Sequence, residues 1–144
     1  MFVDTSAFVA LLAGKPDQDR IAAAMDAAPH ISTSGIVRLE TVMVLSRELN
    51  VAPTAAQFAF DELIAAAEIE VIPFTDEMGR IAVDAFEKFG KGRKSAAQLN
   101  LGDCLSYAVA KGAGLPLLFL GDDFTKVDVP CVLSDPAPMP RKRR

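Results

Sequence analysis

The most restrictive feature of this sequence is a set of short apolar segments that are each followed at once by an acidic or polar residue. Residues 117–120 (LLFL) form a continuous apolar run, which is typical of a strand buried on both faces of a parallel sheet. Gly121, Asp122 and Asp123 follow this run directly. Asp4 likewise ends the apolar start of the chain, MFV. Apolar strands of this kind, separated by helix-like segments, predict an α/β domain.

The segments between these runs carry the periodicity and the end signals of helices. Strands are expected at residues 1–3, 30–34, 69–73, 117–120 and 127–133. Helices are expected at residues 7–14, 18–28, 36–50, 53–67, 76–89 and 101–113. Thr75 is a suitable N-cap, and Asn50 and Gly114 are suitable helix ends. The alternation predicts a mostly parallel central sheet of four or five strands flanked by helices.

Length and composition indicate a single domain. The 144 residues are 51% hydrophobic, with a mean hydropathy of +0.25, which is enough apolar material for one core. We expect a domain over residues 1–134 and a flexible, Pro-rich and basic tail over residues 135–144. No apolar run approaches the ~18 residues of a membrane span, and the start lacks the basic region of a signal peptide. A cytoplasmic protein with reduced thiols at Cys104 and Cys131 is therefore expected.

Charge is distributed unevenly along the chain. Residues 1–90 contain six basic and fourteen acidic residues, whereas residues 91–144 contain nine basic and five acidic ones. Lys91, Arg93 and Lys94 form a basic cluster in a Gly-rich loop. Such a cluster beside an acidic metal site could bind a phosphate backbone, although a solvated loop has the same composition.

Four acidic residues are candidates for a metal site. Asp4 and Asp122 each follow a strand, and ligands of an open parallel sheet bind outside the carboxyl ends of its strands. Glu40 lies in an otherwise apolar helix, and Asp103 lies early in the helix over 101–113. Structural roles are the alternatives: Asp4 and Asp103 could stabilise helix N-termini, and Asp122 could belong to a turn. Glu40 could be an ordinary exposed helix residue.

Acids that converge at one end of a sheet repel each other, so a cation is their natural partner. Oxygen ligands select hard cations, Mg²⁺ or Mn²⁺, and such metals bind phosphates and activate water for in-line attack. His30 is the one histidine in the chain, and a zinc site built on His and Cys is not expected. No Ser-His-Asp arrangement is visible, so a structural role is expected for His30.

Four segments together resemble the PIN-domain family, and most closely the VapC-type ribonuclease toxins of bacterial toxin–antitoxin pairs. They are VDTSAFVALL, RLETVMVL, FGKGRKSAAQLNLGDCLSYAVAKGAGLPLLFLGDDF and VDVPCVL, and the resemblance covers residues 1–134. The order and spacing of LNLGDCLSYAVAK and LLFLGDDF are the specific part of the match. The resemblance implies a PIN-like three-layer sandwich.

The same resemblance assigns roles to the candidate acids. The family's first acid matches Asp4, its helical glutamate matches Glu40, and its third acid matches Asp103. The fourth acid matches Asp122 best, with Asp123 as the alternative, because GDDF replaces the Thr-x-Asp found in many PIN proteins. Asp4 and Asp103 are expected to hold the metal, with Glu40 and the fourth acid completing its shell.

Further residues acquire roles from the resemblance. Thr5 and Ser6 match the polar residues beside the first acid, and Ser6 is expected to assist the metal or the substrate phosphate. The family implies Mg²⁺- or Mn²⁺-dependent cleavage of RNA. Lys91, Arg93 and Lys94 are then expected to position the RNA backbone.

The family also implies a homodimer and neutralisation by a cognate VapB-type antitoxin, with DNA bound only indirectly, through the antitoxin. Two alternatives remain at this point. A metal-dependent phosphatase would also use an Asp after the first strand, but Ser6 occupies the position where the haloacid-dehalogenase type has a second Asp. A catalytically silent PIN-fold binding protein would use the apolar helices over 36–49 and 55–67 as its interface, although most of those positions are expected to be core.

Overall fold

The computed structural model of the chain describes residues 1–133, so residue 134 and the expected tail over 135–144 lie outside the described residues. The strands are β1 (Phe2–Val3), β2 (Ser32–Ser34), β3 (Glu70–Ile72) and β4 (Leu117–Leu118). The helices are α1 (Thr5–Leu12), α2 (Gln18–Asp26), α3 (Gly35–Leu49), α4 (Pro53–Ala66), α5 (Asp76–Phe89) and α6 (Leu101–Ala113). None of these helices has the length and apolar character of a membrane span.

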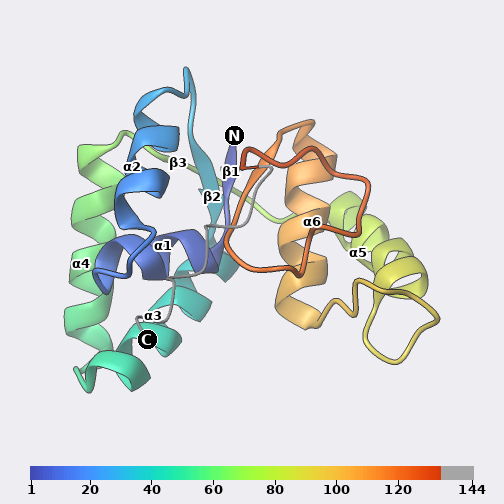
Figure 1. Cartoon of the computed structure of the whole chain (residues 1–144), viewed down its shortest axis with the longest axis horizontal. Coiled ribbons are helices and arrows are strands. Elements are labelled where there is room, and N and C mark those ends of the chain that lie inside the picture. Colours follow the sequence, from blue (N-terminus) through green and yellow to red (C-terminus); the bar gives the residue numbers. More distant parts are fainter. Residues whose placement is uncertain (134–144) are drawn as a thin grey trace, which may run out of the picture.

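The strands form one parallel sheet with helices on both sides. Their order is β3-β2-β1-β4, and all three pairings are parallel. Helices α1, α2 and α4 lie on one side of the sheet, and α5 and α6 lie on the other (Figure 1). The predicted α/β sandwich with a parallel central sheet is thereby confirmed.

The order of the strands creates a switch point between β1 and β4. From β1 the chain continues through α1 and α2 to β2 on one side, whereas β4 arrives on the other side of β1 by way of α5 and α6. The Asp4 N–H, at the end of β1, donates to the Leu118 carbonyl at 3.0 Å. In open parallel sheets, ligands bind outside the carboxyl ends of the strands at such a point. Asp4 and the segment after β4 therefore lie where a ligand site is favoured.

Local capping explains where the helices begin and end. Four N-cap side chains accept a backbone N–H of the first turn, namely those of Asp4 (α1), Ser34 (α3), Thr75 (α5) and Asn100 (α6). Asn50 and Gly114 end α3 and α6 in the left-handed conformation, with φ of 51° and 67°. The expected caps at Thr75, Asn50 and Gly114 are thus confirmed.

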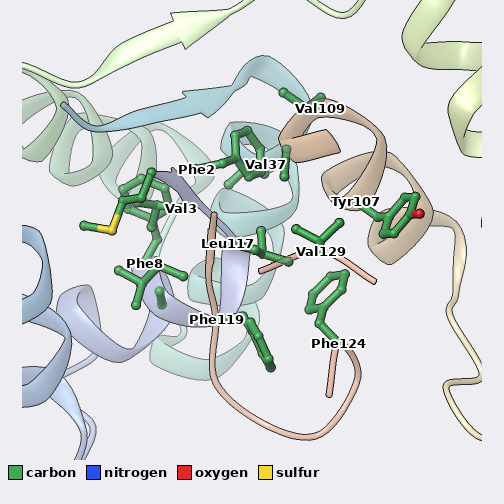
Figure 2. Packing of buried hydrophobic residues seen from close by; sticks show 14 of the residues in the cluster. Phe2, Val3, Phe8, Val37, Tyr107, Val109, Leu117, Phe119, Phe124 and Val129 are labelled. Carbon is green, nitrogen blue, oxygen red and sulfur yellow. The ribbon is translucent and has the colours of Figure 1, made fainter. Parts of the chain in front are cut away.

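The final strand predicted over residues 127–133 is wrong in its extent. This segment pairs with β4 at a single bridge, between Leu117 and Cys131. The Pro130 carbonyl accepts a hydrogen bond from the Leu117 N–H at 2.8 Å, but proline has no N–H with which to extend the ladder. The apolar residues of the segment fill the core instead, and Figure 2 shows Val129 beside Leu117.

Aromatic side chains form much of the core between the sheet and its helices. Phe2, Phe8 and Phe60 are fully buried, and the rings of Phe8 and Phe60 lie 4.8 Å apart. After β4, Phe119 and Phe124 meet edge to face at 5.0 Å (Figure 2). This second ring pair folds the loop that follows β4 back onto the core.

Substitution of Phe60 by Ala should lower the free energy of unfolding by about 3–5 kcal/mol, because it leaves a cavity beside Phe8. Phe58 lies on the same helix but is 67% exposed, so it is a matched control. Phe58→Ala should change the stability by less than about 0.5 kcal/mol. Urea unfolding followed by circular dichroism measures both variants, and equal losses would contradict the different burial of the two rings.

Candidate active site

Asp4, at the carboxyl end of β1, is buried and fully hydrogen-bonded. Its Oδ1 accepts from Ser106 Oγ at 2.8 Å, and its Oδ2 accepts from Ser6 Oγ at 2.9 Å and from the Ser6 N–H at 3.2 Å. Ser6 Oγ itself accepts from the Leu120 N–H at 3.0 Å. Burial raises the pKa of Asp4 above its usual range, and the hydrogen bonds from Ser106 and Ser6 act in the opposite direction.

Asp103 lies in the first turn of α6, where it takes part in a capping box. Asp103 Oδ2 accepts from the Asn100 N–H at 3.0 Å, and Asn100 Oδ1 accepts from the Asp103 N–H at 2.9 Å. Burial raises the pKa of Asp103 to about 6, against the effect of the Asn100 hydrogen bond. The negative charges of Asp123, Asp4 and Glu40 raise this pKa further, so these four acids share one neighbourhood.

The two acids after β4 differ in their relation to this neighbourhood. Asp122 is exposed and belongs to a turn, in which its carbonyl accepts from the Thr125 N–H at 3.2 Å and from Thr125 Oγ1 at 2.8 Å. Asp123 is exposed as well, but its charge raises the pKa of Asp103 more than the charges of Asp4 and Glu40 do. The electrostatics therefore favour Asp123, the alternative in the sequence match, as the fourth acid.

Glu40 reaches the cluster from α3. Its side chain is half-buried, and its carboxylate lies against the first turn of α6 at Gly102. In the described part of the chain, this carboxylate has no hydrogen bond or ion pair. A carboxylate without a protein partner beside Asp103 remains available to water or to a cation.

The loop after β4 that carries Asp123 is anchored on both sides. At its start, the Leu120 N–H donates to Ser6 Oγ. Further along, Asp128 accepts from the Tyr107 hydroxyl at 2.5 Å and from Lys111 Nζ at 3.0 Å, both on α6. These contacts fix the loop between α1 and α6.

The chemistry of the cluster fits a hard divalent cation, although its side chains are not preassembled around one point. In residues 1–133, no three Asp, Glu, His or Cys side chains form a group that could hold a metal ion as they stand. Serines engage both oxygens of Asp4, and the capping box engages one oxygen of Asp103. None of the ion pairs among the described residues involves the four acids. Uncompensated carboxylate oxygens are the donors that Mg²⁺ and Mn²⁺ prefer.

Sequence reasoning missed Ser106 as part of this site. Ser106 is three residues after Asp103, and side chains at this spacing share a helix face, so helical periodicity could have indicated it. Of the expected supporting residues, Ser6 uses its hydroxyl to link Asp4 to the Leu120 N–H. The buried Thr5 hydroxyl has no partner among the described residues.

The basic cluster lies in the loop that leads directly into the Asp103 end of α6 (Figure 1). Lys91, Arg93 and Lys94 are all exposed. The Gln98 side chain orders this loop through hydrogen bonds of 2.6 to 3.0 Å to three backbone groups. The Arg93 guanidinium lies 4.6 Å from the centre of the Phe86 ring. The cationic loop therefore leads into the helix end that bears Asp103.

Other residues with reactive side chains do not join the site. His30 Nε2 lies 2.7 Å from Glu70 Oε2, which links the amino-terminal ends of β2 and β3, opposite to the acids. Cys104 and Cys131 are free thiols, and burial raises the pKa of both. These positions agree with the structural role expected for His30.

Known proteins are similar to this chain in sequence and in fold. The sequence pattern of the PIN domain matches residues 1–130. Ribonuclease VapC28 of Mycobacterium tuberculosis is 41% identical over 124 residues, which are 86% of this chain and 91% of the relative. Ribonuclease VapC42 of the same organism is 35% identical over 129 residues, 90% of this chain and 96% of the relative.

A solved structure shows the same fold. The crystal structure of Mycobacterium tuberculosis VapC20, described as a sarcin-ricin loop cleaving toxin, superposes with a TM-score of 0.72 at 22% identity and covers 94% of this chain and 98% of that one. A toxin–antitoxin complex from Klebsiella pneumoniae superposes with a TM-score of 0.63 at 16% identity, covering 88% and 91%. The chain belongs to the PIN-domain family, and its curated relatives there are VapC ribonucleases.

Proposed function

We propose that this protein is a metal-dependent endoribonuclease and the toxin of a toxin–antitoxin pair. The observation that carries the proposal is the gathering of Asp4, Glu40, Asp103 and Asp123 without a compensating cation from the described chain. The cluster lies at the switch point of a PIN fold, beside an exposed basic loop. The names of the relatives support RNA as the substrate class.

Asp4 and Asp103 would hold Mg²⁺ or Mn²⁺, with Glu40 and Asp123 completing the shell directly or through water. Such a metal, when bound, polarises the scissile phosphate and activates water for in-line attack. The chain itself supplies orientation: the Ser6 and Ser106 hydroxyls fix the Asp4 carboxylate. The Glu40 carboxylate, which has no partner among the described residues, would orient the attacking water.

The exposed cations would position the substrate. Lys91, Arg93 and Lys94 would contact the phosphate backbone and fix the register of the RNA without reading its sequence. An RNA loop with accessible phosphates fits this arrangement better than a regular duplex. We also propose that the protein works in the cytoplasm.

An exposed apolar face next to the acids suits a protein partner. The buried apolar residues of α3 and α4 are Val37, Val42, Leu45, Ala56 and Phe60. The other apolar residues of these helices are half-buried or exposed, so the expectation that most of these positions are core is wrong. Among them, Leu39 and Met43 of α3 are 61% and 62% exposed, and Leu39 is adjacent to Glu40. We assign this face to an apolar segment of a cognate antitoxin, which would block access to the acids. A homodimer, with DNA bound only through the antitoxin, completes the proposed assembly.

The purified protein should cleave RNA with Mg²⁺ or Mn²⁺ and lose this activity in EDTA. Asp4→Asn should reduce cleavage at least by the ~10–100-fold typical of lost supporting groups at metal sites, because Asp4 would be a direct ligand. It should leave the fold intact, since an amide oxygen can still accept from a serine. Gel assays with labelled RNA and a parallel phosphomonoester panel make the measurement. Cleavage that persists in chelator, or hydrolysis of phosphomonoesters alone, would contradict the proposal.

Asp123→Asn should lower RNA cleavage about 10-fold or more, whereas Asp122→Asn should leave it nearly unchanged. The reason is that the charge of Asp123 raises the pKa of the Asp103 carboxyl, whereas the part that Asp122 plays in the turn is through its backbone carbonyl. The two variants differ by one position and remove the same charge, so each controls for the other. A loss of cleavage in Asp122→Asn alone would contradict this prediction and would identify Asp122, the better match in the sequence, as the fourth acid.

The raised pKa of Asp103 predicts a pH dependence of stability. This pKa is about 6 in the folded protein, against a usual value of 3.8, so the folded state binds the proton more tightly. The stabilising contribution of protonated Asp103 is therefore lost as the pH rises through about 6. In EDTA, Asp103→Asn should raise the melting temperature more at pH 7.5 than at pH 5, whereas the exposed control Asp122→Asn should not. A pH-independent effect would contradict the raised pKa.

A further inference from the structure

Gly102, the second residue of α6, lies where the Glu40 carboxylate meets the helix. A Cβ atom built on Gly102 would lie 2.1 Å from Glu40 Oε2 and 3.1 Å from Glu40 Cδ. Distances under 3.0 Å are essentially never seen for real Cβ atoms. Any other residue at position 102 would therefore have to displace the Glu40 carboxylate.

Backbone conformation does not explain this glycine. The glycines with positive φ among the described residues are Gly14, Gly92, Gly114 and Gly121, and Gly102 is not one of them. Within a helix, glycine is less favourable than alanine because it loses more conformational freedom on folding. The close approach of Glu40 is the contact that accounts for a glycine at this position.

The electrostatics of the helix end favour a carboxylate there. The first N–H groups of a helix lack partners within it and carry a partial positive charge. Asn100 Oδ1 accepts the Asp103 N–H, but the Gly102 N–H has no hydrogen-bond partner among the described residues. The Glu40 carboxylate has no hydrogen bond or ion pair among the described residues. The partial positive charge of the first turn of α6 therefore attracts this carboxylate, and no hydrogen bond holds it in a fixed position.

We propose that Gly102 is a positioning residue for the active site: its missing side chain lets the Glu40 carboxylate lie against the first turn of α6, beside Asp103. This proposal rests on the proposed function, in which Glu40 orients water and completes the metal shell. Gly102 contacts neither substrate nor metal and acts only through Glu40. A methyl group at position 102 would turn Glu40 away and leave Asp4 and its serines undisturbed.

Gly102→Ala tests the proposal, with Gly35→Ala as the matched control. Gly35 is the first residue of α3, has no positive φ, and would carry a Cβ with nothing within 4 Å. Gly102→Ala should lower kcat for RNA cleavage by about 10–100-fold, the range for lost supporting groups at metal sites, with little change in KM. It should also weaken Mn²⁺ binding in isothermal titration calorimetry, whereas the melting temperature stays equal or rises. Gly35→Ala should match the wild type in kcat, KM and Mn²⁺ affinity, and its melting temperature should stay equal or rise.

A second set of variants asks whether Gly102 acts through Glu40. If it does, Gly102→Ala should add little to the losses of kcat and Mn²⁺ affinity already caused by Glu40→Gln, because both substitutions remove the same carboxylate. Losses that multiply in the double variant would overturn the proposal. Wild-type kcat and Mn²⁺ affinity in Gly102→Ala would overturn it too, as would a clear fall in melting temperature, which would mean that α6 moves instead of Glu40.

These outcomes separate the inference from the proposed function. A wild-type protein that cleaves no RNA with Mg²⁺ or Mn²⁺ would contradict the ribonuclease proposal. The effect of Gly102→Ala on Mn²⁺ affinity would still decide whether the glycine positions Glu40. Conversely, a fully active Gly102→Ala enzyme would leave the ribonuclease proposal in place and remove the positioning role.

Discussion

The Asp4 carboxylate is the group around which the rest of the site is arranged. Burial of a charged carboxylate is unfavourable unless it is hydrogen-bonded, and hydrogen bonds to charged groups contribute about 1.5–3 kcal/mol each. The donors come from two separate helices, Ser6 in α1 and Ser106 in α6. Ser6 also accepts from the Leu120 N–H after β4. The hydrogen bonds to the buried Asp4 carboxylate therefore connect β1, α6 and the loop that carries Asp123. Because this carboxylate needs these donors, its burial fixes the geometry of the site.

Parallel topology brings these distant residues together. Ser106 is 102 positions from Asp4, and the two meet because β4 returns beside β1 while α6 packs across the same edge. Each acid then arrives on a different element, Asp4 after β1, Glu40 on α3, Asp103 on α6 and Asp123 after β4. No element carries more than one of them, so the cluster exists only in the folded chain. The repulsion among its charges, which adds to the effect of burial in raising the pKa of Asp103, is accordingly a property of the folded state.

The sequence predicted most of the fold because its signals are local. The apolar run before Asp122 and the cap at Thr75 act over a few residues, and both elements were placed correctly. The strand over 127–133 was not, because Pro130 limits the ladder while the apolar residues still enter the core. Strand ends and the family resemblance led to Asp4 and Asp103. The choice between Asp122 and Asp123 depends on the conformation of the turn after β4. The position of the Glu40 carboxylate at Gly102 depends on a contact between α3 and α6. Neither feature can be read from a local sequence pattern.

The arrangement of cations around the site is as informative as that of the acids. Arg38 is two residues from Glu40 on α3, and side chains at this spacing do not face each other. Instead its guanidinium pairs with Asp61 on α4 and lies 5.0 Å from the centre of the Phe60 ring. Lys111, on the same helix as Asp103, is likewise held by Asp128. The ion pairs of the described residues thus leave the acidic cluster without a cationic side chain, and a soluble divalent cation would relieve its repulsion.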